Sequence, residues 1–335
     1  MRVFLGLCLA ALLAACVSQM PRAVPGGDSV AGDCLLSVQE DGGGLASVNL
    51  ATNARHFYPV GPMPHEVAVS RNSAFAYVSQ FGMRDANHEI GTPGDHITRI
   101  DLATGDTQNW MLPDGVRGPH GVRLYSDEAF TNAEIGDRMV VFDANTGAVK
   151  RTFPLPPLVH HFLFSQEGVI YAFAAANGVY KLDPRDGHVL AHADIGSPAR
   201  SVWLTRDERQ VLVAGRGEVV FLNAGDLSVA RRVPVSGVTQ IIYATIDFRD
   251  NLIFAPAPGE NVVVALDLAT GAERARITPG HTPTMAVPGP DGRIYIPSVG
   301  ETYITAVDPA HGFATTQIGP FQRPNGIAFG SCARG

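Results

Sequence analysis

The chain has 335 residues, of which 45% are hydrophobic and 17% are charged, so it can bury a large core and is not a disordered polypeptide. Its 36 glycines and 24 prolines indicate many tight turns between short strands. The net charge of -7 argues against a basic, nucleic-acid-binding surface, so we expect no nucleic-acid partner.

The N-terminal segment has the features of an export signal. Residues 1–15 carry one basic residue, Arg2, followed by an apolar run too short to span a bilayer as a stable helix. The run leads into Leu-Ala-Ala-Cys at residues 13–16, which resembles the lipobox of bacterial lipoproteins. This resemblance implies a signal peptide and a lipid on the sulfur of Cys16. The residue after Cys16 is Val17 rather than Asp, which resembles the sorting signal for the outer membrane. The alternative for residues 1–15 is a buried N-terminal helix, but such a helix would need polar residues on one face, and this segment has none.

The next segment predicts a tether between lipid and protein. Residues 16–32 contain several prolines and glycines and show no apolar periodicity. We therefore expect a flexible tether, followed by a single folded domain over residues 33–335. The folded domain would stand near a lipid bilayer, in the periplasm or on the cell surface.

The predicted domain contains a repeated phrase: an apolar strand, then Asp or Asn, then a turn rich in Ala, Thr, Pro and Gly. The Asp or Asn lies at Asn49, Asp101, Asp143, Asp183, Asn223, Asp267 and Asp308. Successive positions are 40 to 52 residues apart, which predicts an all-β, seven-bladed β-propeller of four-stranded antiparallel blades. Because the acidic residues directly precede turns, we expect them to accept backbone hydrogen bonds there rather than form a catalytic cluster.

Several motifs resemble the YVTN family of bacterial seven-bladed β-propellers. They are the Asp-Leu-Ala-Thr-Gly turns, Tyr-Val-Ser-Gln at 77–80, Pro-His-Gly-Val at 119–122 and Phe-Thr-Asn at 130–132. The resemblance extends over about residues 33–332. It implies the architecture but no particular activity, because propellers carry many unrelated functions.

The two ends of the domain predict how the ring closes. The last inner strand, residues 325–330, has no second strand after it, and the domain begins near Cys34 with a second strand that lacks an inner one. We expect the two to complete one blade, with a Cys34–Cys332 disulfide where other blades have a hairpin. Cys8 lies in the signal peptide and Cys16 is the predicted lipid site, so this pair remains in an oxidising compartment. Two unpaired buried thiols are the alternative.

Aligning the inner strands by their turns places seven residues at one equivalent position near the strand start. They are His65, His120, His160, Arg200, Tyr243, Thr284 and Asn325. Neutral imidazoles from adjacent blades are ligands that zinc or copper prefers, so the three histidines are candidate metal ligands. The other four are candidate ligand-binding residues, with Arg200 as a clamp for an anion. Alternatively, the histidines hydrogen-bond to the backbone and close the channel.

Other candidate residues come from a long insertion and a strand end. In propellers of the YVTN type, loops between second and third strands lie on the face where inner strands begin. His88, His96 and Glu134 would then reach the histidines as further ligands or as a catalytic base. Strand alternation predicts that His161 points away from its neighbour His160.

Two functional hypotheses remain open at the level of the sequence. The first is a binding module of the cell envelope that recognises a protein, a glycan or a small molecule without chemistry. The second is a metal-binding protein or a zinc- or copper-dependent enzyme at the channel mouth. The sequence contains no hydrolase elbow, phosphate-binding loop, haem attachment motif or metalloprotease motif, so the reaction, if any, stays open. We expect a monomer.

Overall fold

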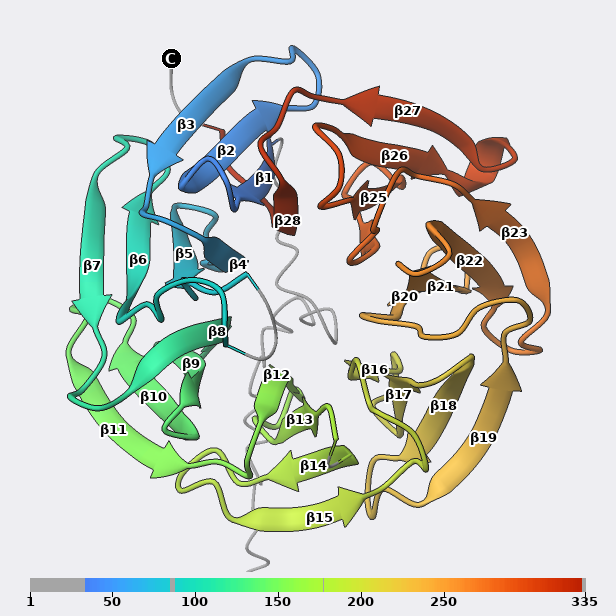
Figure 1. Cartoon of the computed structure of the whole chain (residues 1–335), viewed down its shortest axis with the longest axis horizontal. Coiled ribbons are helices and arrows are strands. Elements are labelled where there is room, and N and C mark those ends of the chain that lie inside the picture. The colour runs from blue at the N-terminus through green and yellow to red at the C-terminus, as the bar shows by residue number, and fades with distance from the viewer. Residues whose placement is uncertain (1–33, 85–87, 177, 333–335) are drawn as a thin grey trace, which may run out of the picture.

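The computed structural model describes residues 34–84, 88–176 and 178–332. They form seven four-stranded antiparallel sheets, arranged as blades around a central axis (Figure 1). This confirms the predicted all-β, seven-bladed propeller. The predicted signal peptide, Cys16 and the tether lie outside the described residues. Within the described ranges, no helix is long and apolar enough to cross a membrane.

Each blade runs outward from an inner strand at the axis to an exposed outer strand (Figure 1). The first three blades consist of β28 (Pro324–Gly330), β1 (Cys34–Gln39), β2 (Gly44–Asn49) and β3 (Arg55–Pro59); β4 (Pro64–Val69), β5 (Phe75–Gln80), β6 (His96–Asp101) and β7 (Thr107–Met111); β8 (Arg117–Tyr125), β9 (Glu128–Ile135), β10 (Arg138–Asp143) and β11 (Val149–Pro154).

The other four blades are built in the same order, and the last contains one 3₁₀-helix, η1 (Pro309–His311). Their strands are β12 (Val159–Phe164), β13 (Ile170–Ala174), β14 (Gly178–Leu182) and β15 (Val189–Ala193); β16 (Trp203–Leu204), β17 (Gln210–Ala214), β18 (Glu218–Asn223) and β19 (Val229–Pro234); β20 (Thr245–Asp247), β21 (Leu252–Ala257), β22 (Val262–Asp267) and β23 (Glu273–Ile277); β24 (Val287–Pro288), β25 (Ile294–Pro297), β26 (Ile304–Asp308) and β27 (Ala314–Ile318).

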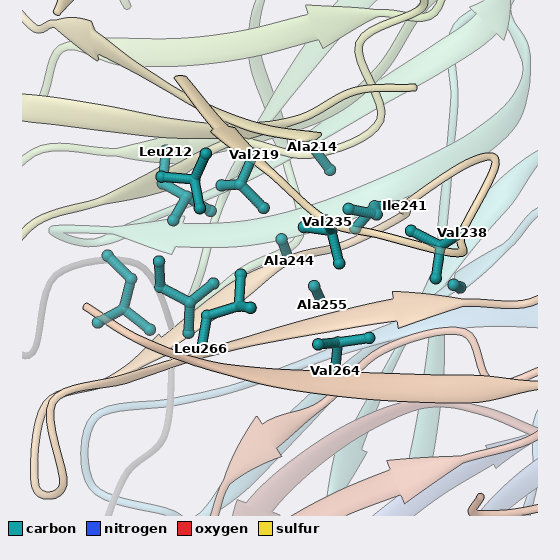
Figure 2. Close-up of a cluster of buried hydrophobic side chains, with 14 of the residues drawn as sticks. Leu212, Ala214, Val219, Val235, Val238, Ile241, Ala244, Ala255, Val264 and Leu266 are labelled. Atoms are coloured by element: carbon teal, nitrogen blue, oxygen red, sulfur yellow. The ribbon is translucent and has the colours of Figure 1, made fainter. Parts of the chain in front are cut away.

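The core lies between neighbouring blades rather than at one centre. In Figure 2, Leu212 and Val219 of one blade lie near Ala255 and Leu266 of the next, within one buried cluster. Middle strands are buried on both faces, which explains their nearly continuous apolar sequence. Burying each large aliphatic side chain stabilises the fold by about 1.5–3 kcal/mol, so packing between neighbouring blades stabilises the ring.

The repeated acidic residues form turns, as predicted. The Oδ1 atom of Asp101 accepts hydrogen bonds from the backbone N–H groups of Ala103, at 2.9 Å, and Thr104, at 3.1 Å. Equivalent backbone N–H groups donate to Asp143, Asp183, Asp267 and Asp308. These carboxylates stabilise the turn between the third and fourth strands of each blade and do not meet one another.

The ring closes within the blade that combines both ends of the domain. Strand β1 pairs antiparallel with β28, and a disulfide joins Cys34 to Cys332 with a Cα–Cα distance of 5.1 Å. Beyond the opposite end of β1, the Glu40 carboxylate accepts hydrogen bonds of 2.6 Å from Arg323 Nε and Asn325 Nδ2. The first and last segments are therefore held together at both faces of the propeller.

Candidate metal centre at the channel mouth

A β-bulge near the start of four inner strands positions the histidines. In β4, β8 and β28, two residues lie opposite one residue of the paired strand, and in β12 one residue is unpaired. The residues at these bulges are His65 and Glu66, His120 and Gly121, Asn325 and Gly326, and His160. A bulge redirects side chains and bends the strand, so it breaks the in-and-out alternation at this position. Consecutive residues can then both face the axis.

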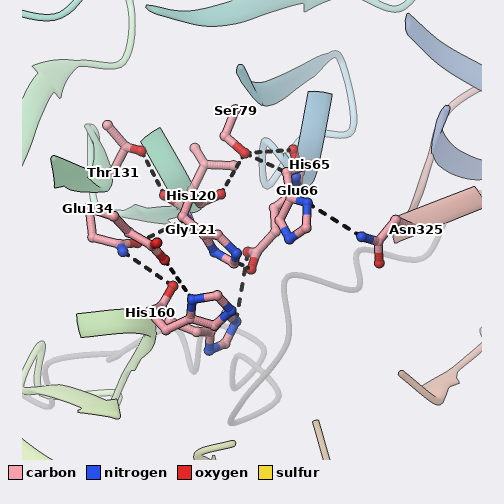
Figure 3. A network of polar contacts seen from close by, with 12 residues as sticks. His65, Glu66, Ser79, His120, Gly121, Thr131, Glu134, His160 and Asn325 are labelled. Carbon is pink, nitrogen blue, oxygen red and sulfur yellow. Dashed lines mark hydrogen bonds and ion pairs between the residues drawn. The ribbon is translucent and has the colours of Figure 1, made fainter. Parts of the chain in front are cut away.

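The three predicted histidines form a continuous row of rings (Figure 3). The ring centroids of His65 and His120 are 4.2 Å apart, and those of His120 and His160 are 3.8 Å apart. Phe81 covers the row, with its ring centroid 4.9 Å from that of His120. The structure thus brings together imidazoles from three adjacent blades in a partly apolar environment.

At one end of the row, Glu134 near the end of β9 lies between two histidines. Its Oε1 is 2.6 Å from His160 Nδ1, and its Oε2 is 2.7 Å from His88 Nε2. The loop between β5 and β6 supplies His88, so this loop reaches the channel mouth as expected. Burial opposes ionisation of Glu134, but these two histidines outweigh it and lower the pKa of the carboxyl.

His96 occupies a different place from His88. It begins β6, the third strand of its blade, and its Nδ1 is 2.8 Å from Asp95 Oδ1. Within the described part of the chain, no ion pair or ring contact joins His96 to the histidine row. The geometry therefore favours His88 over His96 as a residue that acts with Glu134.

At the other end of the row, His65 is engaged by Glu40. The distance from His65 Nδ1 to Glu40 Oε1 is 3.1 Å, and Asn325 Nδ2 donates to the same oxygen at 2.6 Å. Burial opposes ionisation of Glu40, but the hydrogen bonds from His65, Asn325 and Arg323 lower the pKa of the carboxyl to about 2. Burial likewise opposes protonation of His65, yet the Glu40 contact raises the pKa of this imidazole. This end of the row is a hydrogen-bonded ion pair.

His120, in the middle of the row, has the least satisfied side chain. It is 1% exposed, and neither Nδ1 nor Nε2 has a hydrogen-bond partner among the described residues. The nearest acidic atom to Nδ1 is Glu66 Oε1 at 3.6 Å. Burial, together with the nearby positive groups, holds the pKa of His120 well below its usual range. His120 is therefore a neutral imidazole with a lone pair that no described group uses.

One group of side chains has the donor atoms and spacing of a metal site. Ligand atoms of His120, Glu134 and His160 all lie within 4.8 Å of one another. Two imidazoles and one carboxylate form a donor set that suits zinc and other divalent transition metals. His65 is not part of this group. The candidate ligand set in the structure therefore has Glu134 in place of His65, beside the predicted His120 and His160.

The remaining predicted rim residues lie outside this group. Strands β16, β20 and β24 begin after Arg200, Tyr243 and Thr284, so these residues precede the inner strands of their blades. The Arg200 carbonyl accepts a hydrogen bond from Tyr243 N at 2.9 Å, and Thr284 Oγ1 donates to Pro297 O at 3.4 Å. Asn325 meets the end of the histidine row directly, through polar contacts with His65 and Glu40.

A second polar layer lies next to the histidine row, further along the inner strands. It consists of Glu66, Arg123 and His161, and the alignment of the repeats does not identify these residues. Glu66 Oε2 accepts a hydrogen bond from Arg123 Nη1 at 2.8 Å, and Arg123 Nη2 also contacts His161 Nε2. The expectation that His161 points away from its neighbour His160 is wrong, because the bulge at His160 interrupts the alternation and both rings contact Phe173 and Tyr243. The signal that could have identified this layer is the polar residue directly after each rim histidine in β4 and β12.

Fold and side chains thus define a seven-bladed β-propeller with a histidine and glutamate cluster at one end of its axis. No family model and no curated protein matches the sequence. Many solved structures share the fold. Hydrazine synthase from Kuenenia stuttgartiensis matches with a TM-score of 0.66 and 17% identity, over 91% of this chain and 98% of the other.

Two further solved structures are similar at comparable levels. A putative 6-phosphogluconolactonase from Bacteroides fragilis has a TM-score of 0.68 and 12% identity, covering 88% of this chain and 96% of its own. Virginiamycin B lyase from Staphylococcus aureus has a TM-score of 0.64 and 14% identity, covering 80% and 89%. Identities this low show the fold alone, and the differing activities in these names agree with a scaffold that serves many functions.

Proposed function

We propose that this protein is a lipid-anchored β-propeller of the bacterial cell envelope that binds a divalent transition metal ion through His120, Glu134 and His160. In this proposal the metal-bearing channel mouth is the surface that recognises a ligand. The lipobox-like residues 13–16 and the Cys34–Cys332 disulfide support an exported, envelope-associated protein. The YVTN-like repeats support a bacterial binding propeller.

The observation that carries the metal proposal is the state of His120. Leaving a buried polar atom without a partner costs about 1–3 kcal/mol, so such an atom calls for an explanation. The alternative is that the histidines only close the channel through hydrogen bonds. His65 and His160 satisfy that alternative, but His120 does not, because both of its ring nitrogens lack partners in the described ranges. A cation bound between His120, Glu134 and His160 would be coordinated by the lone pair of the His120 imidazole, which no described group uses.

The surroundings support zinc or copper over a hard cation such as magnesium. Imidazole suits zinc and copper, whereas magnesium prefers oxygen ligands and water. His88 contacts the second oxygen of Glu134 and would hold this ligand in place, as outer contacts do in metal sites. Three protein ligands leave a coordination position for an external ligand. A substrate or a group on a partner would bind there.

The test is the metal content of the exported form, residues 18–335, purified from a periplasm without a histidine tag. We expect about one equivalent of zinc or copper by mass spectrometry, and reuptake of one equivalent after chelation. His120→Ala and Glu134→Gln should each lower the metal affinity at least tenfold. Disulfide titration and circular dichroism would show that the variants fold.

His65→Ala is the matched control, because it removes an imidazole of the same row outside the proposed ligand group. We expect this variant to keep its metal. Loss of metal from His65→Ala would instead support the predicted three-histidine set of His65, His120 and His160. A wild-type protein that neither contains nor takes up zinc or copper would refute the metal proposal and leave a metal-free binding module.

A further inference from the structure

A cavity occupies the propeller axis on the far side of the histidine row. Its volume is about 370 Å³, and residues of all seven inner strands line it. Along β28, Asn325 lies at the histidine row, whereas Ile327 and Ala328, further along the strand, line the cavity. The hairpins β16–β17, β20–β21 and β24–β25, at the opposite face from the histidines, form its outer end.

The wall of the cavity is mainly apolar. Trp203, Phe248, Met285, Val287 and Ile327 contribute to it. A volume of this size lies in the range of small-molecule sites, which combine apolar walls with a few polar groups. The indole Nε1 of Trp203 and the hydroxyl of Tyr243, which also lines the cavity, have no hydrogen-bond partner among the described residues.

The inner end of the cavity is electrically balanced. Arg123 and Glu66 both line it and form a salt bridge of 2.8 Å, with their side chains 19% and 6% exposed. Their charges cancel locally, and the pair separates the cavity from His120. The inner end therefore favours neither an anion nor a cation.

The outer end carries two arginines whose guanidinium groups donate to backbone carbonyls. Arg206 Nη2 donates to the carbonyl of Phe248 at 2.9 Å, and Arg249 Nη2 donates to that of Pro290 at 3.3 Å. Neither guanidinium forms a salt bridge with another described residue. Asp247, the acidic lining residue at this end, is 5% exposed and accepts backbone hydrogen bonds. On a chain with a net charge of -7, two exposed arginines around an apolar opening form a local positive site.

We propose that this cavity binds a small aromatic anion whose apolar body packs against Trp203 and Met285 while its carboxylate or sulfonate lies between Arg206 and Arg249. Guanidinium groups recognise such anions through paired N–H donors. The site is distinct from the proposed metal centre, because it lies beyond the Glu66–Arg123 pair and opens at the opposite face. It does not depend on metal at the other end.

Two dyes with the same ring skeleton test this proposal. They are 8-anilinonaphthalene-1-sulfonate, which carries the sulfonate, and N-phenyl-1-naphthylamine, which lacks it. The seven blades and the disulfide all lie within residues 34–332, so the exported form, residues 18–335, contains the complete fold. We expect one molecule of the sulfonate dye to bind per chain by calorimetry, equally well before and after treatment with a chelator.

Three variants separate the contributions. Arg206→Gln combined with Arg249→Gln should weaken the sulfonate dye about tenfold and the neutral dye less than twofold. Val287→Trp, which fills the cavity, should abolish binding of both. Val149→Trp adds the same side chain on the outer strand β11, where Val149 is 43% exposed, and should change neither affinity.

The results that would overturn the proposal are specific. They are a wild-type protein that does not bind the sulfonate dye at about 100 μM, binding that survives Val287→Trp, or an arginine variant that weakens both dyes equally. If Val287→Trp does not fold, the arginine variant decides, because both arginines are exposed at the cavity entrance. Chelator-insensitive binding with no metal uptake would refute only the metal proposal.

Discussion

Glu40 provides a quantitative test of how the ring closes at the channel mouth. Its carboxylate is 5% exposed and accepts hydrogen bonds from Arg323 and Asn325, near the start of β28, and from His65 of the next blade. In the folded protein its pKa falls from 4.5 to about 2. Because each pKa unit corresponds to 1.36 kcal/mol, ionised Glu40 stabilises the native state by about 3 kcal/mol.

The sign of this effect fixes the pH range. A carboxyl with a depressed folded pKa stabilises the protein above its unfolded pKa, and the stabilisation disappears as the pH falls from about 5 to 2. Glu40→Gln imitates the protonated side chain. We therefore expect this variant to be less stable than wild type by about 3 kcal/mol at pH 7, with the difference approaching zero near pH 2.

Denaturant unfolding at a series of pH values measures this difference. Glu301→Gln is the matched control, because Glu301 also pairs with a histidine, His281, whose side chain is 75% exposed. Its loss should cost less than about 1 kcal/mol, as is typical of surface pairs. Parallel stability curves for wild type and Glu40→Gln from pH 7 to 2 would refute the assignment of Glu40 as a charged clamp.

Three further predictions concern anchorage, closure and the channel interior. Cys16→Ser should move the protein from the membrane fraction to the soluble fraction after cell lysis, and an unchanged distribution would contradict lipid anchorage at this residue. Replacing Cys34 and Cys332 by Ala should lower the free energy of unfolding by about 5 kcal/mol, since the disulfide closes a loop with a sequence separation of 298; a change below about 1 kcal/mol would show that strand pairing alone closes the ring. Glu66→Gln should destabilise the fold by about 3 kcal/mol because Arg123 loses its partner, and adding Arg123→Met should restore part of this; thermal unfolding that is equal in the single and double variants would argue against a buried ion pair.

The sequence was sufficient for the architecture because the repeat determines it. Each turn that begins with Asp or Asn ends the third strand of a blade, so the spacing of these turns counts the blades. The closing blade was predictable for a related reason: a lone inner strand and a lone second strand can satisfy their backbone groups only by pairing. Register and turn chemistry are local properties, and a periodic sequence displays them directly.

The site was only partly predictable, because its geometry depends on departures from the repeat. Equivalent positions identified His65, His120 and His160, whose rings lie side by side. The glutamates that contact these histidines do not lie at equivalent positions of the repeat. Glu40 follows the second strand of the closing blade, and Glu66 faces inward through a bulge that the sequence pattern does not mark. A strict two-residue strand period therefore fails to predict that Glu66 and His161, which directly follow rim histidines, also lie at the channel.

The distribution of charge along the axis explains why the mouth and the cavity are chemically different. Glu40, Glu66 and Glu134 surround the histidine row, which favours a cation there. The cavity beyond the row has Arg206 and Arg249 in its lining, and both are exposed, which favours an anion at this end. The salt bridge of Glu66 and Arg123 lies between the two regions, and both of its residues line the cavity. Because Glu66 Oε2 pairs with Arg123 at 2.8 Å while Glu66 Oε1 is 3.6 Å from His120 Nδ1, this carboxylate offsets positive charge on both sides, and we expect dye binding in the cavity to be independent of metal at the histidine row.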